Sequence, residues 1–411
     1  MNNEDKKNTL LLGRADWHFR ANALVIAYLL AALVSGVFQR GSHGGIPTWL
    51  TVHFLLLGAV TNAIITWSDH FASALLWARS QSRTRQMTVI SLLNVGILGV
   101  LFSVSYHLQW LVISSATVLG GVIVYYLIGM THLIKKSFNK KFKGVIAFYQ
   151  FAGLMILVGI VLGAVDASKA DEDVWQARLT LAHLHVNLLG WVGLTVIGTL
   201  VTLWPTVLRT QMHPQAISRA ILGLKFLVCG ILGSIVGSLW GQPLILAIGI
   251  VSYLIGTLLA LLPAALLLRR RMPDRSSSWM LLSGSVGLLV LLVGDVCLVL
   301  VERKPVEILD ALESHLLLIF TLWLLPIFLG ALTYLLPVVL GRGPALNRRL
   351  ESVLNFGWRW RIFLLPLSSL LQVFPEEFHI MGQALAALAI ALFLVLVLIA
   401  MRRSRTVVTS V

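Results

Sequence analysis

The sequence predicts an all-α, multi-pass membrane protein, and three observations support this fold class: composition, segment length and charge distribution. Of the 411 residues, 58% are hydrophobic and only 12% are charged, with a mean hydropathy of +0.88. A soluble domain carries about 25% charged residues. The apolar residues form runs of about 18 to 25, long enough for a helix to cross a hydrocarbon core of about 30 Å. Little sequence is left for a catalytic domain outside the bilayer.

Twelve apolar segments are predicted to span the membrane. In chain order they are residues 20–38, 48–67, 87–105, 109–130, 145–165, 179–204, 217–238, 242–268, 279–301, 314–340, 360–374 and 379–401. The segment 360–374 is the shortest and contains Pro366, which disfavours a continuous helix. The first segment follows basic residues as a signal peptide does. No small-residue cleavage site follows it, however, and eleven more apolar segments do.

The basic residues predict the orientation. Most of the 32 Lys and Arg residues fall in segments that share one side of the membrane if the N-terminus is cytoplasmic. This pattern predicts a bacterial cytoplasmic membrane protein with both termini inside. The net charge of +15 is then a topology signal and a contact with anionic lipid, and no nucleic-acid surface is expected.

The acidic residues are concentrated in outer segments. Two explanations stay open: ordinary solvated loops, or a docking rim for a basic external partner. The residues concerned are Asp166, Asp171, Glu172, Asp173, Glu302, Glu307, Asp310, Glu313, Glu376 and Glu377.

An internal repeat of 132 residues divides the predicted helices into three groups of four. The eleven residues from Gly198 match those from Gly330 at six positions, and Pro205 aligns with Pro337. The same offset aligns His183 with His315, and His53 with His185. We therefore predict a single transmembrane domain, 1–411, with three pseudo-repeats at about 10–140, 141–272 and 273–405.

Four histidines in repeat-related positions are the predicted site. His53, His183, His185 and His315 lie near the outer ends of the second helix of each repeat. His183 and His185 point about 200° apart on one helix, so each would serve a different site. Imidazole is the usual axial ligand of haem, and an intramembrane histidine marks a functional site. We predict two bis-histidine haem pairs, His53 with His183 and His185 with His315. The alternative is that these histidines only bond neighbouring helices or loops.

The stretch AHLHVNLLGWVGLTVIGTLVTLWP, residues 182–205, resembles the H-x-H helix of haem–copper oxidase subunit I and its nitric oxide reductase relatives. The resemblance is closest to a divergent bacterial branch, some members of which are fused to copper nitrite reductase-type domains. It implies twelve helices in three arcs of four, with haem b, one or two per chain, on opposite sides of the H-x-H helix. Copper is a further cofactor that the resemblance leaves open.

The sequence also departs from that family. Its H-x-H motif lies on the sixth helix instead of the tenth, and the seventh helix contains no histidine pair for copper. No tyrosine follows His183 or His185 at a spacing of four, so an oxygen-reducing, proton-pumping centre is not expected. Whether the chain is an enzyme, an oxidoreductase with an incomplete haem–copper centre, is left open.

Asp295 is the only acidic residue predicted inside the membrane. It would bind a proton, a quinol hydroxyl or a cation, or it would be a hydrogen-bonded structural carboxyl. Lys225 is predicted to extend towards the membrane interface.

The favoured function is electron transfer by a haem-binding membrane protein, from quinol to an external copper or haem protein. Two alternatives stay open: a haem protein that binds or reduces nitric oxide or another small oxidant, and a cofactor-free transporter of a solute or metal.

Overall fold

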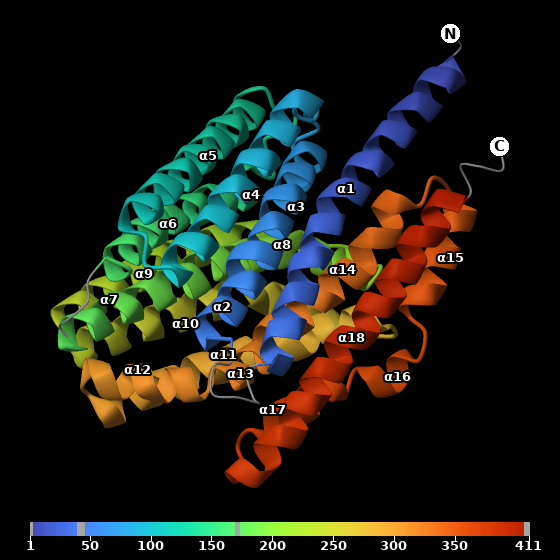
Figure 1. Cartoon of the computed structure of the whole chain (residues 1–411). Coiled ribbons are helices and arrows are strands. Elements are labelled where there is room, and N and C mark those ends of the chain that lie inside the picture. Colours follow the sequence, from blue (N-terminus) through green and yellow to red (C-terminus); the bar gives the residue numbers. More distant parts are fainter. Residues whose placement is uncertain (1–2, 39–45, 169–172, 407–411) are drawn as a thin grey trace. The chain divides into compact units, whose positions relative to one another are not determined.

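The computed structural model describes residues 3–38, 46–168 and 173–406, and these are helical almost throughout, with no strand among them (Figure 1). The all-α prediction is confirmed for this part of the chain. Eleven helical segments within it are long and apolar enough to cross a membrane. They are Ala15–Phe38, Thr48–Leu75, Arg83–Ser105, Gln109–Lys135, Lys143–Asp166, Val174–Val207, Ala216–Trp240, Pro243–Arg269, Ser276–Glu302, Leu316–Leu340 and Glu376–Arg405.

The count of twelve predicted spans is not confirmed, because the predicted segment 360–374 contains only short helices. These are α16 (Trp358–Arg361) and α17 (Leu364–Leu371). The eight residues of α17 rise about 12 Å, well short of a hydrocarbon core of about 30 Å. The apolar run is therefore interrupted between its two helices instead of forming one span.

The chain divides into two compact units, each assembled from segments far apart in the sequence. Unit 1 comprises residues 1–63, 273–288 and 316–411, and unit 2 comprises residues 64–272 and 289–315. This division does not follow the predicted repeat boundaries. Helices α3 (Thr61–Leu75) and α11 (Ser276–Glu302) each contribute to both units.

Unit 1 contains the N-terminal helix, the C-terminal helix and the helices between residues 316 and 371. They are α1 (Asn3–Phe38), α2 (Thr48–His53), η1 (Phe54–Val60), α13 (Leu316–Ile319), η4 (Phe320–Leu324), α14 (Leu325–Leu340), α15 (Pro344–Leu354), α16, α17 and α18 (Glu376–Thr406). Helix α18 packs against α1, α14, α15 and α17 within this unit.

Unit 2 is built mainly from consecutive helices that pack on their neighbours. They are α4 (Arg83–Ser105), α5 (Gln109–Lys135), α6 (Lys143–Asp166), α7 (Asp173–His185), η2 (Val186–Gly193), α8 (Leu194–Val207), α9 (Ala216–Trp240), α10 (Pro243–Leu266), the 3-10 turn η3 (Leu267–Arg269) and α12 (Pro305–Ser314). Helix α7 packs on α6, α9 and α12, which positions the H-x-H sequence inside this unit.

Helices α9 and α10 make the closest helix pair of unit 2. A Cβ atom at Gly223 would lie 2.6 Å from the carbonyl oxygen of Gly256, and one at Gly230 would lie 2.6 Å from the backbone nitrogen of Tyr253. Only glycine permits this approach, as in membrane helix pairs whose small residues let backbones touch. The contact leaves the buried Tyr253 phenol to donate a hydrogen bond to the carbonyl of Leu189, at 2.9 Å.

Three π-helical segments interrupt the helices that carry the candidate histidines. Segment η1 begins directly after His53, and η2 begins directly after His185. Val186 stands 132 residues after Phe54, and Phe320, the first residue of η4, stands 134 residues after Val186. Single π turns inside α-helices occur frequently at functional sites. The spacing matches the sequence repeat closely.

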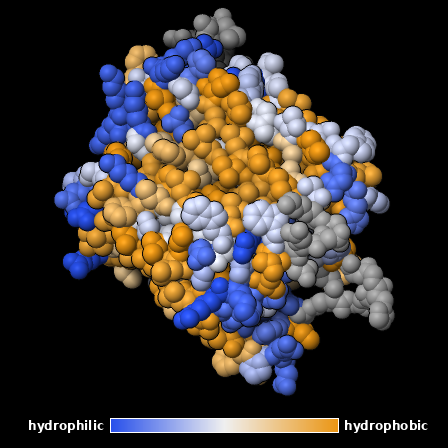
Figure 2. All heavy atoms as spheres, turned by 90° about the vertical axis from the view of Figure 1, so that its left-hand side faces the viewer, coloured by the Kyte–Doolittle hydropathy of each residue, from blue (hydrophilic) through white to orange (hydrophobic). Residues whose placement is uncertain are grey.

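The surface carries a broad apolar area. Figure 2 shows hydrophobic side chains covering the middle of one face, while hydrophilic side chains gather towards its edges. Several large side chains of unit 2 are more than half exposed, among them Ile113, Val161, Leu244 and Ile248. Soluble monomers rarely expose continuous apolar areas of this extent. With the eleven candidate spans, this surface is consistent with contact between the protein and lipid.

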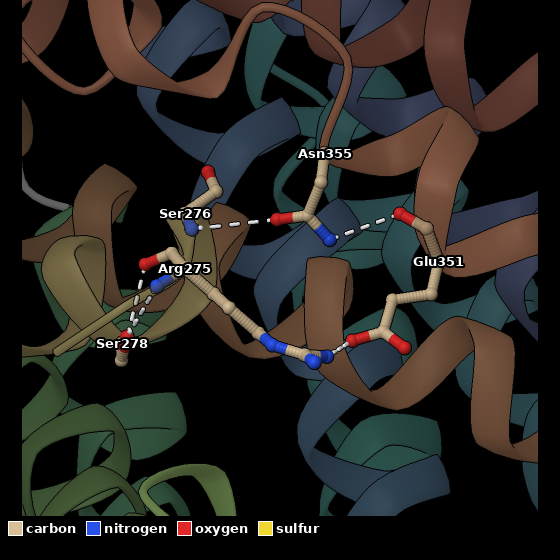
Figure 3. A network of polar contacts seen from close by, with 5 residues as sticks. All are labelled: Arg275, Ser276, Ser278, Glu351 and Asn355. Carbon is tan, nitrogen blue, oxygen red and sulfur yellow. Dashed lines mark hydrogen bonds and ion pairs between the residues drawn. The ribbon is translucent and has the colours of Figure 1, made fainter. Parts of the chain in front are cut away.

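A polar network in unit 1 joins the start of α11 to α15 (Figure 3). The Arg275 guanidinium forms an ion pair with Glu351, and the backbone nitrogen of Ser276 donates to Oδ1 of Asn355 at 3.3 Å. Asn355 in turn donates to the carbonyl of Glu351, at 2.9 Å. The first N–H groups of a helix have no partner within the helix, so Asn355 supplies one from a distant segment.

Candidate functional site

His185 and Asp295 form a buried pair in unit 2. Nε2 of His185 lies 3.2 Å from Oδ2 of Asp295, although 110 residues separate them. Nδ1 of His185 lies 2.8 Å from the carbonyl oxygen of Leu181. A carbonyl oxygen only accepts hydrogen bonds, so Nδ1 carries a proton. The contact between Nε2 and Oδ2 then needs one further proton, held by either atom. The pair is therefore a proton-holding site.

Asp295 has one carboxylate oxygen without a partner. Oδ1 is buried and accepts no hydrogen bond from any described residue. Asp295 lies seven residues before the end of α11 at Glu302, about 10 Å along the helix axis. A buried acceptor without a donor costs free energy, so this oxygen has the capacity to bind a further donor.

His183 lies in a groove formed by two glycines of α6. Its Nδ1 lies 2.9 Å from the carbonyl oxygen of Gly159. A Cβ atom at Gly163 would lie 2.6 Å from Cε1 of the imidazole, so the ring position requires a glycine there. Asn187, one turn after His183, packs against Gly159 and donates to the carbonyl of His183 at 2.8 Å. These contacts fix the orientation of the ring.

His53 is anchored in unit 1 in a similar way. Its Nδ1 lies 2.8 Å from the carbonyl oxygen of Trp49, and its ring stacks on the Trp49 indole with centroids 4.3 Å apart. An Nδ1–H held by a backbone carbonyl makes Nε2 the ring nitrogen that ligates a metal. This arrangement is not specific to ligands, however. His132, an exposed residue of α5, also places Nδ1 2.8 Å from the carbonyl four residues before it.

His315 is the most accessible of the four histidines. It stands between α12 and α13 and is exposed. Its Nδ1 lies 2.7 Å from the carbonyl of Ala311 and 2.9 Å from Oγ of Ser314. Within the described part of unit 2, no contact joins His315 to His185, whose Nε2 is directed at Asp295.

The predicted site residues are therefore only partly brought together. The sequence paired His185 with His315, whereas the contact that the structure shows is between His185 and Asp295. His53 and His183 belong to different units, so their pairing stays a prediction. Among the described residues, no three His, Cys, Asp or Glu side chains are grouped so as to hold a metal ion.

Asp295 is not the only acidic residue within the candidate spans, and that prediction was wrong. Helix α3 continues to Leu75 and includes Asp69, which accepts a hydrogen bond from Gln86 at 2.9 Å. The predicted span ended at residue 67 because the sequence becomes polar there. Lys225 is exposed on α9, and Cys229 and Cys297 are exposed free thiols.

The acidic outer segment between residues 302 and 313 is a helix instead of a loop. Helix α12 buries Ile308 and Leu312 and packs on α7, while Lys304 forms an ion pair with Glu307 at 2.7 Å. Of the other predicted acidic positions, Asp171 and Glu172 lie outside the described residues, as does His43.

Sequence reasoning did not identify Gly159, Gly163 and Asn187 as parts of the site. The signal was present, because Gly159 and Gly163 form a G-x-x-x-G pair, which is typical of close helix contacts in membranes. The identity of the helix that packs on this pair could not be inferred from the sequence.

Searches against protein families and against curated proteins find no match for this chain. The functional assignment therefore depends on the residues and contacts of the chain itself.

Proposed function

We propose that the protein is a haem-binding integral membrane protein that transfers electrons, with His183 as an axial ligand. The orientation of His183 carries this proposal, because its Nδ1 is held by the Gly159 carbonyl and its ring lies against Gly163. Nε2 is then the ligating nitrogen. When bound, haem b supplies a one-electron carrier, and the protein supplies the ligand and a low-dielectric setting.

The donor set fits a haem better than a protein-only metal centre. Haem brings four equatorial nitrogens of its own and needs one or two axial ligands from the protein, so isolated histidines are sufficient. His53 is the second ligand expected from the sequence repeat. A second haem on His185 would require Asp295 to release Nε2, so the proposal commits to the haem at His183. Copper would need more ligands than the described histidines bring together.

Three further parts of the proposal come from the sequence. The 132-residue repeat, supported by the spacing of the π-helical segments, makes the histidine positions equivalent in three groups of helices. The distribution of basic residues orients both termini towards the cytoplasm of a bacterium, which places the histidines near the outer surface. Electrons would then pass from a membrane quinol to an external copper or haem protein.

The test is a dithionite-reduced minus oxidised absorbance spectrum of the purified protein, with a pyridine haemochrome assay of haem content. His183→Ala removes the axial ligand, and we expect the haem of that site to be lost. His132→Ala is the matched control, because His132 makes the same kind of Nδ1–carbonyl contact on an exposed helix face. Unchanged haem content in His183→Ala, or no haem in wild-type protein made with ample haem supply, contradicts the proposal.

A second candidate function, cofactor-free transport of a proton-coupled solute or a metal, is favoured by one observation. A buried His–Asp pair within a membrane span is typical of proton relays in transporters. Haem-free protein that acidifies or alkalinises proteoliposomes during substrate uptake would favour transport over electron transfer.

A further inference from the structure

We propose that the His185–Asp295 pair accepts the hydroxyl protons of a hydroquinone dissolved in the lipid. This inference rests on the proposed electron-transfer function, to which it adds the binding site of the electron donor. The pair is the only one of the four candidate histidine sites in which the structure joins a histidine to a carboxylate. Asp295 also retains Oδ1, a buried acceptor to which no described residue donates.

Access to Asp295 is from the apolar surface. On α11, Gly294 and Cys297 are exposed beside it, and a Cβ atom at Gly294 would meet no atom within 4 Å. Val293 is half exposed. These neighbours offer little to a hydrated solute, but they accommodate an apolar ring. The molecule that reaches Oδ1 from this side is therefore lipophilic and carries a hydrogen-bond donor.

A hydroxyl group fits the site better than a metal cation. Hard cations take about six oxygen ligands, whereas Asp295 offers one open oxygen and its neighbour His185 offers none. Within the described residues, no third His, Cys, Asp or Glu completes such a cluster. One hydroxyl hydrogen bond is sufficient to satisfy Oδ1.

The positions of His183 and His185 on one helix connect the proton site with the proposed haem. Two residues apart, they point about 200° from each other, so a donor at His185 and a haem at His183 lie on opposite sides of the same helix. Oxidation of one hydroquinone to the quinone breaks two O–H bonds and releases two protons and two electrons. Two ferric haem equivalents take up the electrons one at a time. Asp295 and His185 take each proton from the hydroxyl and release it to the outer aqueous phase.

The experiment compares Asp295→Asn with wild type in vesicles of phosphatidylethanolamine and phosphatidylglycerol. Haem reduction is followed by stopped-flow absorbance with decylubiquinol, and separately with dithionite. An amide is a weaker proton acceptor than a carboxylate, so we expect reduction by decylubiquinol to slow by about tenfold or more, with dithionite reduction and haem content unchanged. Asp166→Asn is the control, because Asp166 also has a buried oxygen without a partner but bonds Thr180 instead of a histidine.

A binding measurement without turnover separates this inference from the proposed function. Quenching of tryptophan fluorescence by a redox-inactive 4-hydroxyquinoline reports occupancy whether or not haem is bound. We expect weaker binding in Asp295→Asn and in the second variant, His185→Gln, both checked for a monodisperse folded state. If folded Asp295→Asn protein keeps the wild-type decylubiquinol rate and affinity, the inference is wrong while the haem assignment stands. If binding is lost as expected but no haem is present, electron transfer is wrong.

Discussion

Two ion pairs, one in each unit, show how burial changes the role of the same chemistry. The His185–Asp295 pair of unit 2 leaves only 1% and 15% of the two side chains exposed, and one carboxylate oxygen has no donor. In the Arg275–Glu351 pair of unit 1 the exposed fractions are 28% and 32%, and Asn355 and Ser276 complete a hydrogen-bonded network around it.

The difference indicates a binding role for the first pair and a structural role for the second. A charge at a half-exposed position is screened and contributes little to stability, so the Arg275 network mainly holds the start of α11 against α15. A carboxylate in an apolar span is costly unless it is paired, and here the pairing is incomplete. The remaining capacity of Asp295 is what a ligand or proton would use.

The largest stability effect is expected for Asp295→Asn. Removing the charge weakens the contact with His185 in a low-dielectric setting, which we expect to cost about 2 kcal/mol in the free energy of unfolding. Thermal unfolding in detergent micelles measures it. Glu307→Gln is the control, because Glu307 pairs with Lys304 at the exposed start of α12. An equal loss in both variants would remove the contrast between buried and exposed pairs.

A smaller effect is expected for Glu351→Gln. Glutamine keeps the size of the side chain and a carbonyl that accepts a hydrogen bond from Arg275, so the expected loss is about 0.5 kcal/mol and decreases at high salt. The same unfolding assay at low and high ionic strength checks this. A loss as large as that of Asp295→Asn would show that the network is energetically equivalent to the membrane pair.

The smallest effect concerns Glu313 at the end of α12, outside the candidate spans. Partial burial, with a contribution from the negative charge of Asp310, raises the pKa of the Glu313 carboxyl. The folded state then holds its proton at pH values where the unfolded chain has lost it, so stability decreases as pH rises from the usual glutamate value of about 4.3 through the folded pKa. Glu313→Gln should remove this small decrease, measured as the unfolding temperature against pH. An unchanged profile would contradict the assignment to Glu313.

Much of the fold follows from the sequence because a transmembrane helix needs only a long apolar run. Ten of the predicted segments correspond to candidate spans in order, and an eleventh, residues 314–340, begins at Leu316 in the structure. The segment 360–374 differs, since its apolar content does not distinguish one spanning helix from α17 and a second short helix. Asp69 was missed for a related reason, because a helix continues past the point where its side chains become polar.

The sequence by itself determined the membrane class, the positions of the four histidines along their helices, and the opposite directions of His183 and His185. These properties depend on hydropathy and on the 100° rotation per residue, both of which are local. Only the tertiary structure decided that Asp295 is the partner of His185, that Gly159 and Gly163 receive His183, and that Asn355 caps α11. Each of these contacts joins segments 24 to 110 residues apart, and which helices become neighbours depends on the packing of all side chains together.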